Sequence, residues 1–478
     1  MQMPPRIFVA IDQGGQSSRT IAFDERGRRL AGAAVPVSTR RPAAGHYEQD
    51  PDELETSIRS ALGQVVPALP AAASIRAGLA TQRSSIACWD RETGAALSPV
   101  LSWRDTRNAA WLDSLDLDAL RINRVTGLRP SAHYGASKLR WCLDNLPAVA
   151  DAQQAGTLAW GPLASFLVFR LTREHTLAAD PVNASRTLLW DFSTADWSQA
   201  LLKRFGLPDG PLPPVVAGDA GFGTIDVGGL SIPLARCTGD QAAALYARGD
   251  PATDVAYVNA GTGAFILQPT EHPEDQGRLL TSVTRGDKDG IRLALEGTVN
   301  GAAAALESVA ADLGISDWIA TLEAVSDSPV DPPLFLNGES GLGSPWWRED
   351  FGSRFVGPGD SQLRLLAVLE SIAFMLSVNL EICRHRAGPQ AEIVITGGLG
   401  RSDPLCRRLA SLNRLTVRRP AAAEATARGL AWLLAEQVDG WPESRAAELF
   451  EPRPDADLAG RFARWRDLME RALRGDAV

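Results

Sequence analysis

A glycine turn near the start of the chain has the composition of a phosphate site. Residues 9–21 read as an apolar strand, a turn that contains Gly14 and Gly15, and a second strand. The two glycines can bring backbone N–H groups up to an anion without a side chain in the way. Asp12 offers carboxylate oxygens to Mg2+, and Arg19 offers a planar cation to phosphate oxygens. The alternative is a plain β-hairpin, for which Gly-Gly is a common turn.

A second strand–turn–strand unit, residues 255–267 around Gly261-Thr262-Gly263, opens the other half of the chain. Repetition of such a unit is what a fold with two similar domains around a nucleotide would show. A length of 478 residues also favours two domains. We therefore expect an N-terminal domain over 1–247 and a C-terminal domain over 248–478, with a helical appendage from about residue 437.

Composition excludes several classes of protein. The net charge of −9 argues against binding to nucleic acid or to an anionic membrane surface. Five widely spaced cysteines without a C-x-x-C pair predict reduced, buried thiols in a cytoplasmic protein. We expect no signal peptide and no apolar run as long as a membrane span. No Walker A, G-x-G-x-x-G or G-x-S-x-G sequence is present, and the five histidines lack metal-ligand spacing.

The elements that must position these turns alternate between strands and helices. Consecutive antiparallel strands are expected from Ile7 to about Val37, and a helix begins at Asp50 or Asp52. Strands are then expected at 75–79, 86–89 and 100–103, and a mostly helical stretch at 139–171. In the second half, strands are expected at 292–295, 393–396 and 415–417, and helices at 300–313, at 363–386, from Pro404 and from Glu424. This alternation predicts an α/β fold.

Many short stretches, in order along the whole chain, carry a family resemblance. They are Asp12-Gln-Gly14, Ser17-Ser-Arg19, residues 45–51, Gln82-Arg83, Trp89-Asp90, Trp103-Arg-Asp105, Lys138-Leu-Arg-Trp141, residues 183–187, Gly239-Asp-Gln-Ala242, Gly261-Thr-Gly263, Glu296-Gly297, Ser340-Gly-Leu-Gly343, Pro345-Trp-Trp347 and Gly397-Gly398. In these stretches the chain resembles the FGGY carbohydrate kinases, and their glycerol kinase branch most closely.

The resemblance implies two actin/hexokinase/Hsp70-like (ribonuclease H-like) domains, each a mixed five-stranded sheet flanked by helices, with a cleft between them. It implies transfer of the ATP γ-phosphoryl group, with Mg2+, to a hydroxyl of a small polyol or sugar. A carboxylate should accept the hydroxyl proton, and Mg2+ and N–H groups should neutralise phosphate charge. Members of this family are often homodimers or homotetramers, which is also an expectation here.

The resemblance assigns the site residues in four groups. Asp240 is the general base and, with Asp12, a metal ligand; from its position alone, Asp240 reads as the cap of the helix that follows. The phosphates are expected to meet Gly14, Gly15, Gln16, Ser17, Arg19, Gly261, Thr262 and Gly263. The rest of the nucleotide is expected to meet Ala303, Glu307, Gly398 and Ser402. The acceptor is expected to meet Arg83, Ser84, Trp103, His133, Asp240, Gln241 and Phe265.

Seven of these positions depart from the family pattern, three of them in the adenine pocket, where Ala303, Glu307 and Ser402 replace a glycine, a glutamine and an asparagine. Gly15 and Gln16 replace two threonines of the phosphate turn, which suggests a catalytically weak ligand sensor as the alternative to an active kinase. Ser84 replaces a glutamate and His133 a tyrosine in the acceptor site. The lost carboxylate costs a glycerol hydroxyl its partner, about 1–3 kcal/mol. The smaller Ser84 leaves room for a longer polyol or a ketose such as xylulose or ribulose.

Overall fold

The computed structural model describes residues 4–70, 73–273, 276–326, 331–421, 424–436, 441 and 446–476. The chain folds into two compact units, both discontinuous in sequence. Unit 1 comprises Met1–Pro251, Ser282–Leu293 and Ala422–Ser444, and unit 2 comprises Ala252–Thr281, Ala294–Ala421 and Arg445–Val478. The predicted domain limits, 1–247 and 248–478, describe continuous segments and stay a prediction.

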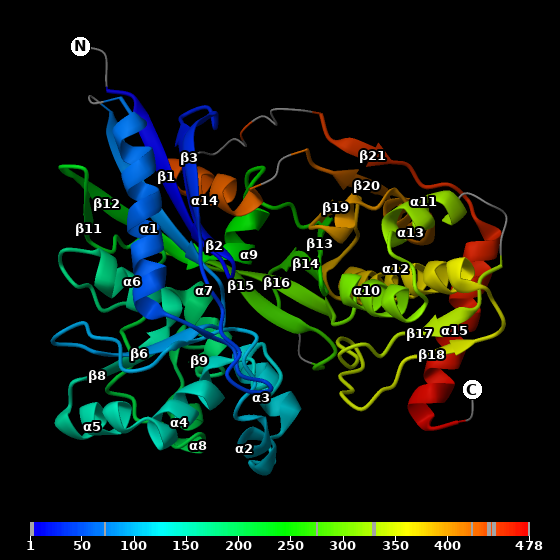
Figure 1. Ribbon diagram of the computed structural model, residues 1–478, viewed down its shortest axis with the longest axis horizontal. Helices are drawn as coiled ribbons and strands as arrows, with labels where there is room; N and C mark the ends of the chain where they lie inside the picture. Colours follow the sequence, from blue (N-terminus) through cyan, green and yellow to red (C-terminus); the bar gives the residue numbers. More distant parts are fainter. Residues whose placement is uncertain are drawn as a thin grey trace. The chain divides into compact units, whose positions relative to one another are not determined.

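Unit 1 is built on a six-stranded mixed sheet with the order β11-β12-β5-β1-β2-β3 (Figure 1). Its strands are β1 (Arg6–Gln13), β2 (Ser17–Asp24), β3 (Arg29–Pro36), β5 (Ser74–Thr81), β11 (Thr224–Val227) and β12 (Leu230–Gly239). Strands β1, β2 and β3 are antiparallel neighbours, as predicted, whereas β5 runs parallel to both β1 and β12. The five strands from β12 to β3 form the expected mixed sheet, and β11 extends its edge.

A smaller sheet of unit 1, with the order β4-β7-β6-β8, comprises β4 (Glu48–Gln49), β6 (Ile86–Asp90), β7 (Val100–Leu101) and β8 (Leu158–Pro162). Strands β9 (Trp190–Asp191) and β10 (Asp196–Trp197) pair separately. The helices are α1 (Pro51–Val65), α2 (Ala109–Ser114), α3 (Ala119–Thr126), α4 (Gly135–Asn145), α5 (Pro147–Ala155), α6 (Leu163–Leu171), α7 (Pro181–Ala184), α8 (Gln199–Arg204), α9 (Asp240–Leu245) and α14 (Ala425–Ala435). The stretch expected to be mostly helical, 139–171, is thus interrupted by β8.

Helices cover both faces of the large sheet. On one face, Val9 of β1 shares a buried cluster with Leu54 of α1, and Asp50 caps α1 as predicted by accepting hydrogen bonds from the amides of the first turn. On the other face α14 lies close to β5, because a Cβ on Gly78 would be 2.9 Å from Leu430 Cδ1. A larger residue at Gly78 would therefore push α14 away from the sheet.

Unit 2 repeats this plan in a seven-stranded sheet with the order β15-β16-β14-β13-β19-β20-β21. The strands of this sheet are β13 (Val255–Ala260), β14 (Ala264–Thr270), β15 (Leu280–Asp287), β16 (Gly290–Val299), β19 (Glu392–Thr396), β20 (Thr416–Arg419) and β21 (Glu448–Phe450), and β17 (Leu334–Leu336) pairs with β18 (Arg354–Val356). The part of β15 and β16 within Ser282–Leu293 belongs to unit 1. As in unit 1, an antiparallel hairpin, β13–β14, is followed in the sheet by two parallel strands, β19 and β20. The helices are α10 (Ala303–Asp312), α11 (Trp318–Ser326), α12 (Ser361–Ala387), α13 (Asp403–Asn413) and α15 (Ala456–Arg474).

Helix α12 is long and apolar enough to cross a membrane, so the expectation that no run reaches this length was wrong. Its most apolar 18-residue stretch has a mean hydropathy of 1.8, and 89% of that stretch is buried inside the protein. Leu369, Ile372 and Leu376 are fully buried in the core of unit 2. The burial identifies α12 as a core helix.

The C-terminal helix α15 is fastened to this core by a buried ion pair. Arg461 donates to Glu370 of α12 at 2.7 and 2.8 Å, and Arg408 of α13 donates to the same carboxylate at 3.2 Å. The indole of Trp465 donates to the carbonyl of Phe335 at 2.9 Å. Helix α15 lies within the segment predicted as a helical appendage, but so does the strand β21, which pairs with β20, and residues 437–440, 442–445 and 477–478 lie outside the described residues.

Candidate active site

In the glycine turn between β1 and β2, some backbone amides are hydrogen-bonded within the turn and others are left available to a ligand. The amide of Gly14 donates to Ser17 O at 3.0 Å, so this N–H closes the turn and is not the anion donor we expected from it. In the part of the chain that the structure describes, no partner is seen for the amides of Gly15 and Gln16. These two N–H groups are the ones left to bind phosphate oxygens.

Three buried glutamines hold the carbonyls of this turn, a feature that the sequence did not reveal. Gln13 donates to Gly14 O at 2.7 Å, and Gln49 donates to Gly15 O at 3.0 Å. Gln82 links the two, since its Nε2 donates to Gln13 Oε1 at 3.2 Å and to Gln49 Oε1 at 2.6 Å. All three side chains are almost completely buried. With its carbonyls tied inward, the turn keeps its N–H groups available to a ligand.

Asp12 and Asp240 form a pair of carboxylates in unit 1. Burial and the nearby Asp240 raise the pKa of Asp12 to about 7, whereas Arg19, whose Nη1 lies 4.0 Å from Asp12 Oδ2, lowers it. Two neighbouring carboxylates, one with its pKa raised to about 7, fit a divalent cation. Among the described residues no group of three or more acidic, His or Cys side chains could hold a metal ion. Mg2+ would therefore need water and phosphate oxygens as further ligands, which is its usual mode of binding.

Asp240 is the first residue of α9, and Gly239, not Asp240, is the N-cap. The expected capping role was therefore wrong in detail, although Asp240 Oδ1 accepts from the amide of Gln241 at 2.7 Å. Burial raises the pKa of Asp240, and Arg83 and Arg186 act in the opposite direction. Arg83 also donates to the side-chain oxygen of Gln241. The structure thus brings together three residues predicted to meet the acceptor.

Three further residues that were predicted to meet the acceptor, Ser84, Trp103 and His133, lie on neighbouring loops of unit 1. His133 Nδ1 is 3.0 Å from Trp103 O, and the amide of Trp103 donates to Ser85 Oγ at 2.9 Å. Ser84 has a left-handed backbone, with φ of 64°. A Cβ on Gly15 would lie 3.8 Å from both Trp103 Nε1 and Gln82 Oε1. The acceptor loops therefore adjoin the phosphate turn.

The corresponding turn of unit 2, Gly261-Thr262-Gly263, is docked on the start of α10. Amides of residues 302–304 donate to the carbonyls of Gly261 and Thr262 at 3.0–3.1 Å. Gly263 has no room for a side chain without crowding, because its Cβ would lie 3.0 Å from Asn300 O. The Thr262 side chain is exposed, and its expected contact with phosphate stays a prediction.

The other residues expected near the nucleotide are spread over unit 2. Gly398 directly precedes a short 3-10 turn, Leu399–Arg401, after β19, and Ser402 uses its hydroxyl to cap α13. Glu307 is exposed on α10. Phe265 of β14, which was expected to meet the acceptor and not the nucleotide, is half-buried. Gly397, which was quoted only as part of a motif, requires glycine: its φ is 90°, and a Cβ would lie 2.3 Å from Ala260 O. This contact packs the end of β19 against the end of β13.

Comparison with known families identifies the chain. The family model of the "FGGY family of carbohydrate kinases, N-terminal domain" matches residues 7–247, and that of the C-terminal domain matches residues 256–437. The chain belongs to the FGGY family of carbohydrate kinases. Like other members of this family it is an ATP-dependent carbohydrate kinase.

Glycerol kinases are among the similar FGGY kinases. The chain is 31% identical to the glycerol kinase of Shewanella amazonensis, over 98% of this chain and 100% of that protein. It is 34% identical to the glycerol kinase of Alkalilimnicola ehrlichii, over 97% and 98%. The fold is similar to Plasmodium falciparum glycerol kinase with ADP (TM-score 0.86, 23% identity, 98% of both chains) and to xylulose kinase from Rhodospirillum rubrum (TM-score 0.84, 19%, 97% and 98%).

Proposed function

We propose that this FGGY kinase transfers the γ-phosphoryl group of Mg-ATP to a hydroxyl of a small polyol or sugar, with Asp240 as the general base. The observation that carries the proposal is the placing of Asp240 beside Arg83 and Gln241, on the first turn of α9. A carboxylate whose pKa is raised accepts a proton more readily, which suits the removal of a hydroxyl proton as the new P–O bond forms.

The other residues of unit 1 that we assign to the site would bind and orient the phosphates and Mg2+. The amides of Gly15 and Gln16, with Arg19, would hold phosphate oxygens, and Asp12 would hold Mg2+, which neutralises phosphate charge when bound. In unit 2, Gly261-Thr262-Gly263 would bind phosphate, and Ala303, Glu307, Gly398 and Ser402 would line the rest of the nucleotide site. The turn of unit 2 is suited to this role because it is held rigidly by α10.

The acceptor we propose is not glycerol itself but a longer polyol or a ketose such as xylulose. Ser84 offers a hydroxyl where glycerol kinases have a carboxylate, and it is a smaller side chain. A buried hydroxyl of glycerol would lose its acceptor there, at a cost of about 1–3 kcal/mol. His133, tied to Trp103 O, would take the place of a tyrosine phenol.

The test measures ADP release from Mg-ATP with glycerol, erythritol, ribitol, xylitol, dihydroxyacetone, xylulose and ribulose. Wild type and Asp240→Asn are compared, and acceptor binding is followed by calorimetry. We expect one longer acceptor to exceed glycerol in kcat/KM and the variant to lose at least a thousandfold in kcat while still binding it. If glycerol wins by a wide margin, the acceptor proposal is wrong. A flat response over the whole panel, with binding retained, would favour a ligand sensor.

A further inference from the structure

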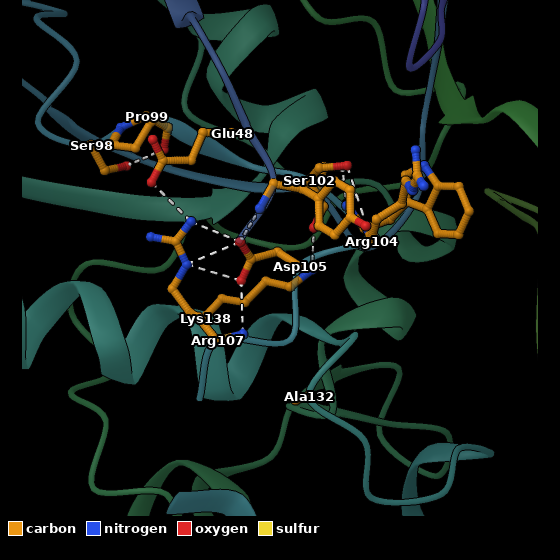
Figure 2. Close-up of polar contacts among 12 residues, drawn as sticks. Glu48, Ser98, Pro99, Ser102, Arg104, Asp105, Arg107, Ala132 and Lys138 are labelled. Carbon is orange, nitrogen blue, oxygen red and sulfur yellow. Dashed lines mark hydrogen bonds and ion pairs between the residues drawn. The ribbon is translucent and has the colours of Figure 1, made fainter. Parts of the chain in front are cut away.

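Lys138, on the first turn of α4, is a buried lysine that binds backbone carbonyls. Its Nζ lies 2.7 Å from Ser102 O, 2.7 Å from His133 O and 3.0 Å from Ser84 O. The residue is 1% exposed, so the ammonium group is shielded from solvent. Figure 2 shows the side chain extended beside Asp105 toward Ser102. Lys138 was quoted as part of a family motif, but no role was predicted for it.

The three carbonyls belong to three separate loops, and each loop carries a residue predicted to meet the acceptor. Ser84 and His133 are themselves such residues, and Ser102 directly precedes the third, Trp103. The loops are far apart in sequence, with 54, 36 and 5 residues separating their carbonyls from Lys138. One side chain thus joins the three loops at a single atom.

An ammonium group is suited to this task because it has three N–H donors around one nitrogen. Each donor has its carbonyl, so every proton of the group is used. The bond to Ser84 O also holds a residue with a left-handed backbone, which a non-glycine residue adopts only where its surroundings favour it. Without this bond, Ser84 is free to relax toward an ordinary conformation.

The charge of Lys138 is balanced within the same cluster. Asp105 is completely buried and accepts from Arg107 at 2.7 Å and from the amide of Tyr47 at 2.7 Å (Figure 2). Arg107 also donates to Glu48 at 2.9 Å. The cluster therefore contains two cations and two carboxylates, which makes a buried lysine tolerable. An apolar residue would be cheaper to bury, but it could not join the three carbonyls.

We infer that Lys138 is a positioning residue that fixes the shape of the acceptor site by tying together the loops of Ser84, Trp103 and His133. It touches no reacting atom and acts through these three residues. The inference deepens the proposed function and rests on it for its kinetic consequence. The tether itself is a property of unit 1 and can be tested without any activity.

The first measurement is hydrogen exchange of the full-length protein. Lys138→Met removes the donors while keeping a side chain of similar length, and Lys203→Met, at an exposed lysine on α8, is the matched control. We expect exchange to rise at least tenfold in all three segments, 83–86, 101–106 and 131–135, and to stay within twofold in the phosphate turn, 14–17. Exchange that rises in only one segment, or not at all, overturns the inference.

The second measurement separates positioning from general damage to the fold. With the best acceptor of the panel, Lys138→Met is expected to raise the acceptor KM at least tenfold and to leave the ATP KM within twofold. Lys138→Arg keeps the charge but has a planar group, so its acceptor KM should lie between those of wild type and Lys138→Met. If the Met variant does not fold, the Arg variant tests the inference. An equal rise of both KM values contradicts the inference. If wild type phosphorylates no acceptor, the proposed function fails and the exchange result alone decides on the tether.

Discussion

Gln82→Glu should disrupt the phosphate turn although the two side chains have the same shape. In the native network Gln82 Nε2 donates to Gln49 Oε1 at 2.6 Å and to Gln13 Oε1 at 3.2 Å. A carboxylate oxygen in that place faces two other acceptors. Gln49 and Gln13 can turn their amide groups round to donate to it, but they then present oxygens to the carbonyls of Gly15 and Gly14. If they turn, the carbonyls of the turn lose their donors; if they do not, Gln13 and Gln49 lose the hydrogen bonds that orient them and face a carboxylate instead.

The size of the effect follows from the contacts. Two hydrogen bonds are lost, at about 1 kcal/mol each, and at least one buried acceptor is left without a donor, at about 1–3 kcal/mol. We expect the free energy of unfolding to fall by roughly 3 kcal/mol. If about half of this falls on the turn, the ATP KM rises roughly tenfold, since 1.4 kcal/mol is a factor of ten.

The assay combines urea unfolding with the ATP KM at saturating acceptor. Gln82→Met removes the donors without adding a charge and should fall between wild type and Gln82→Glu. Gln64→Glu, at an exposed glutamine of α1, controls for the charge change. A Gln82→Glu protein with wild-type stability and ATP KM would show that the glutamines do not hold the turn.

Three further predictions concern other parts of the molecule. Ser84→Glu should raise kcat/KM for glycerol about tenfold by returning an acceptor worth about 1–3 kcal/mol; no gain would contradict the role of this position. Arg461→Met should lower the free energy of unfolding by about 3–5 kcal/mol, because it leaves Glu370 buried with one weaker partner. Arg464, on the same helix, forms an exposed ion pair, so Arg464→Met should lower it by less than about 1 kcal/mol. Equal losses of the two variants in urea unfolding would refute this. Burial lowers the pKa of Lys138 to about 7; the charge of Arg107 also lowers this pKa, whereas the charge of Asp105 raises it. The neighbouring Cys142 has a raised pKa and is a neutral thiol. Below the pKa of Lys138 three protons serve three carbonyls and above it only two, so acceptor KM should rise several-fold from about pH 6 to 8.5. The contribution of Lys138 to stability should rise over that range, since the unfolded chain keeps this proton up to about its usual pKa of 10.5. Asp12, whose pKa is raised to about 7, contributes a fall in stability up to about that pH, so the rise is measured as the difference between wild type and Lys138→Arg, which keeps Asp12 but lacks both Lys138 trends.

The sequence was a good guide to what local patterning decides. Strands β1, β2, β13 and β14, with the glycine turns between them, lie where apolar runs and Gly pairs predicted them. The start of α1 at Asp50 followed from helix-capping chemistry. The five cysteines are all buried and unpaired, as their spacing suggested.

What the sequence could not supply are relations between distant residues. Gln13, Gln49 and Gln82 all lie in stretches that resemble the family, but their roles could not be predicted because these depend on which end of each amide faces which carbonyl. A signal was present in hindsight: each is a polar residue at or just beyond the end of a short strand. Lys138 is likewise defined by three carbonyls on three loops. The helix expected at 363–386 is found as α12, and its burial in the core of unit 2 explains why a stretch of membrane length is so apolar.

The return of α14 to unit 1 has a consequence for synthesis of the protein. The last residue of the long first segment of unit 1, Pro251, leaves the ribosome about 180 residues before α14 is complete at Ala435. At roughly 5–20 residues synthesised per second, the face of the large sheet of unit 1 that α14 covers stays exposed for about ten to thirty-five seconds. During that time the nascent chain exposes apolar surface that only its own distant helix can cover. A premature stop between these points should therefore yield an insoluble N-terminal fragment and not a folded half-enzyme.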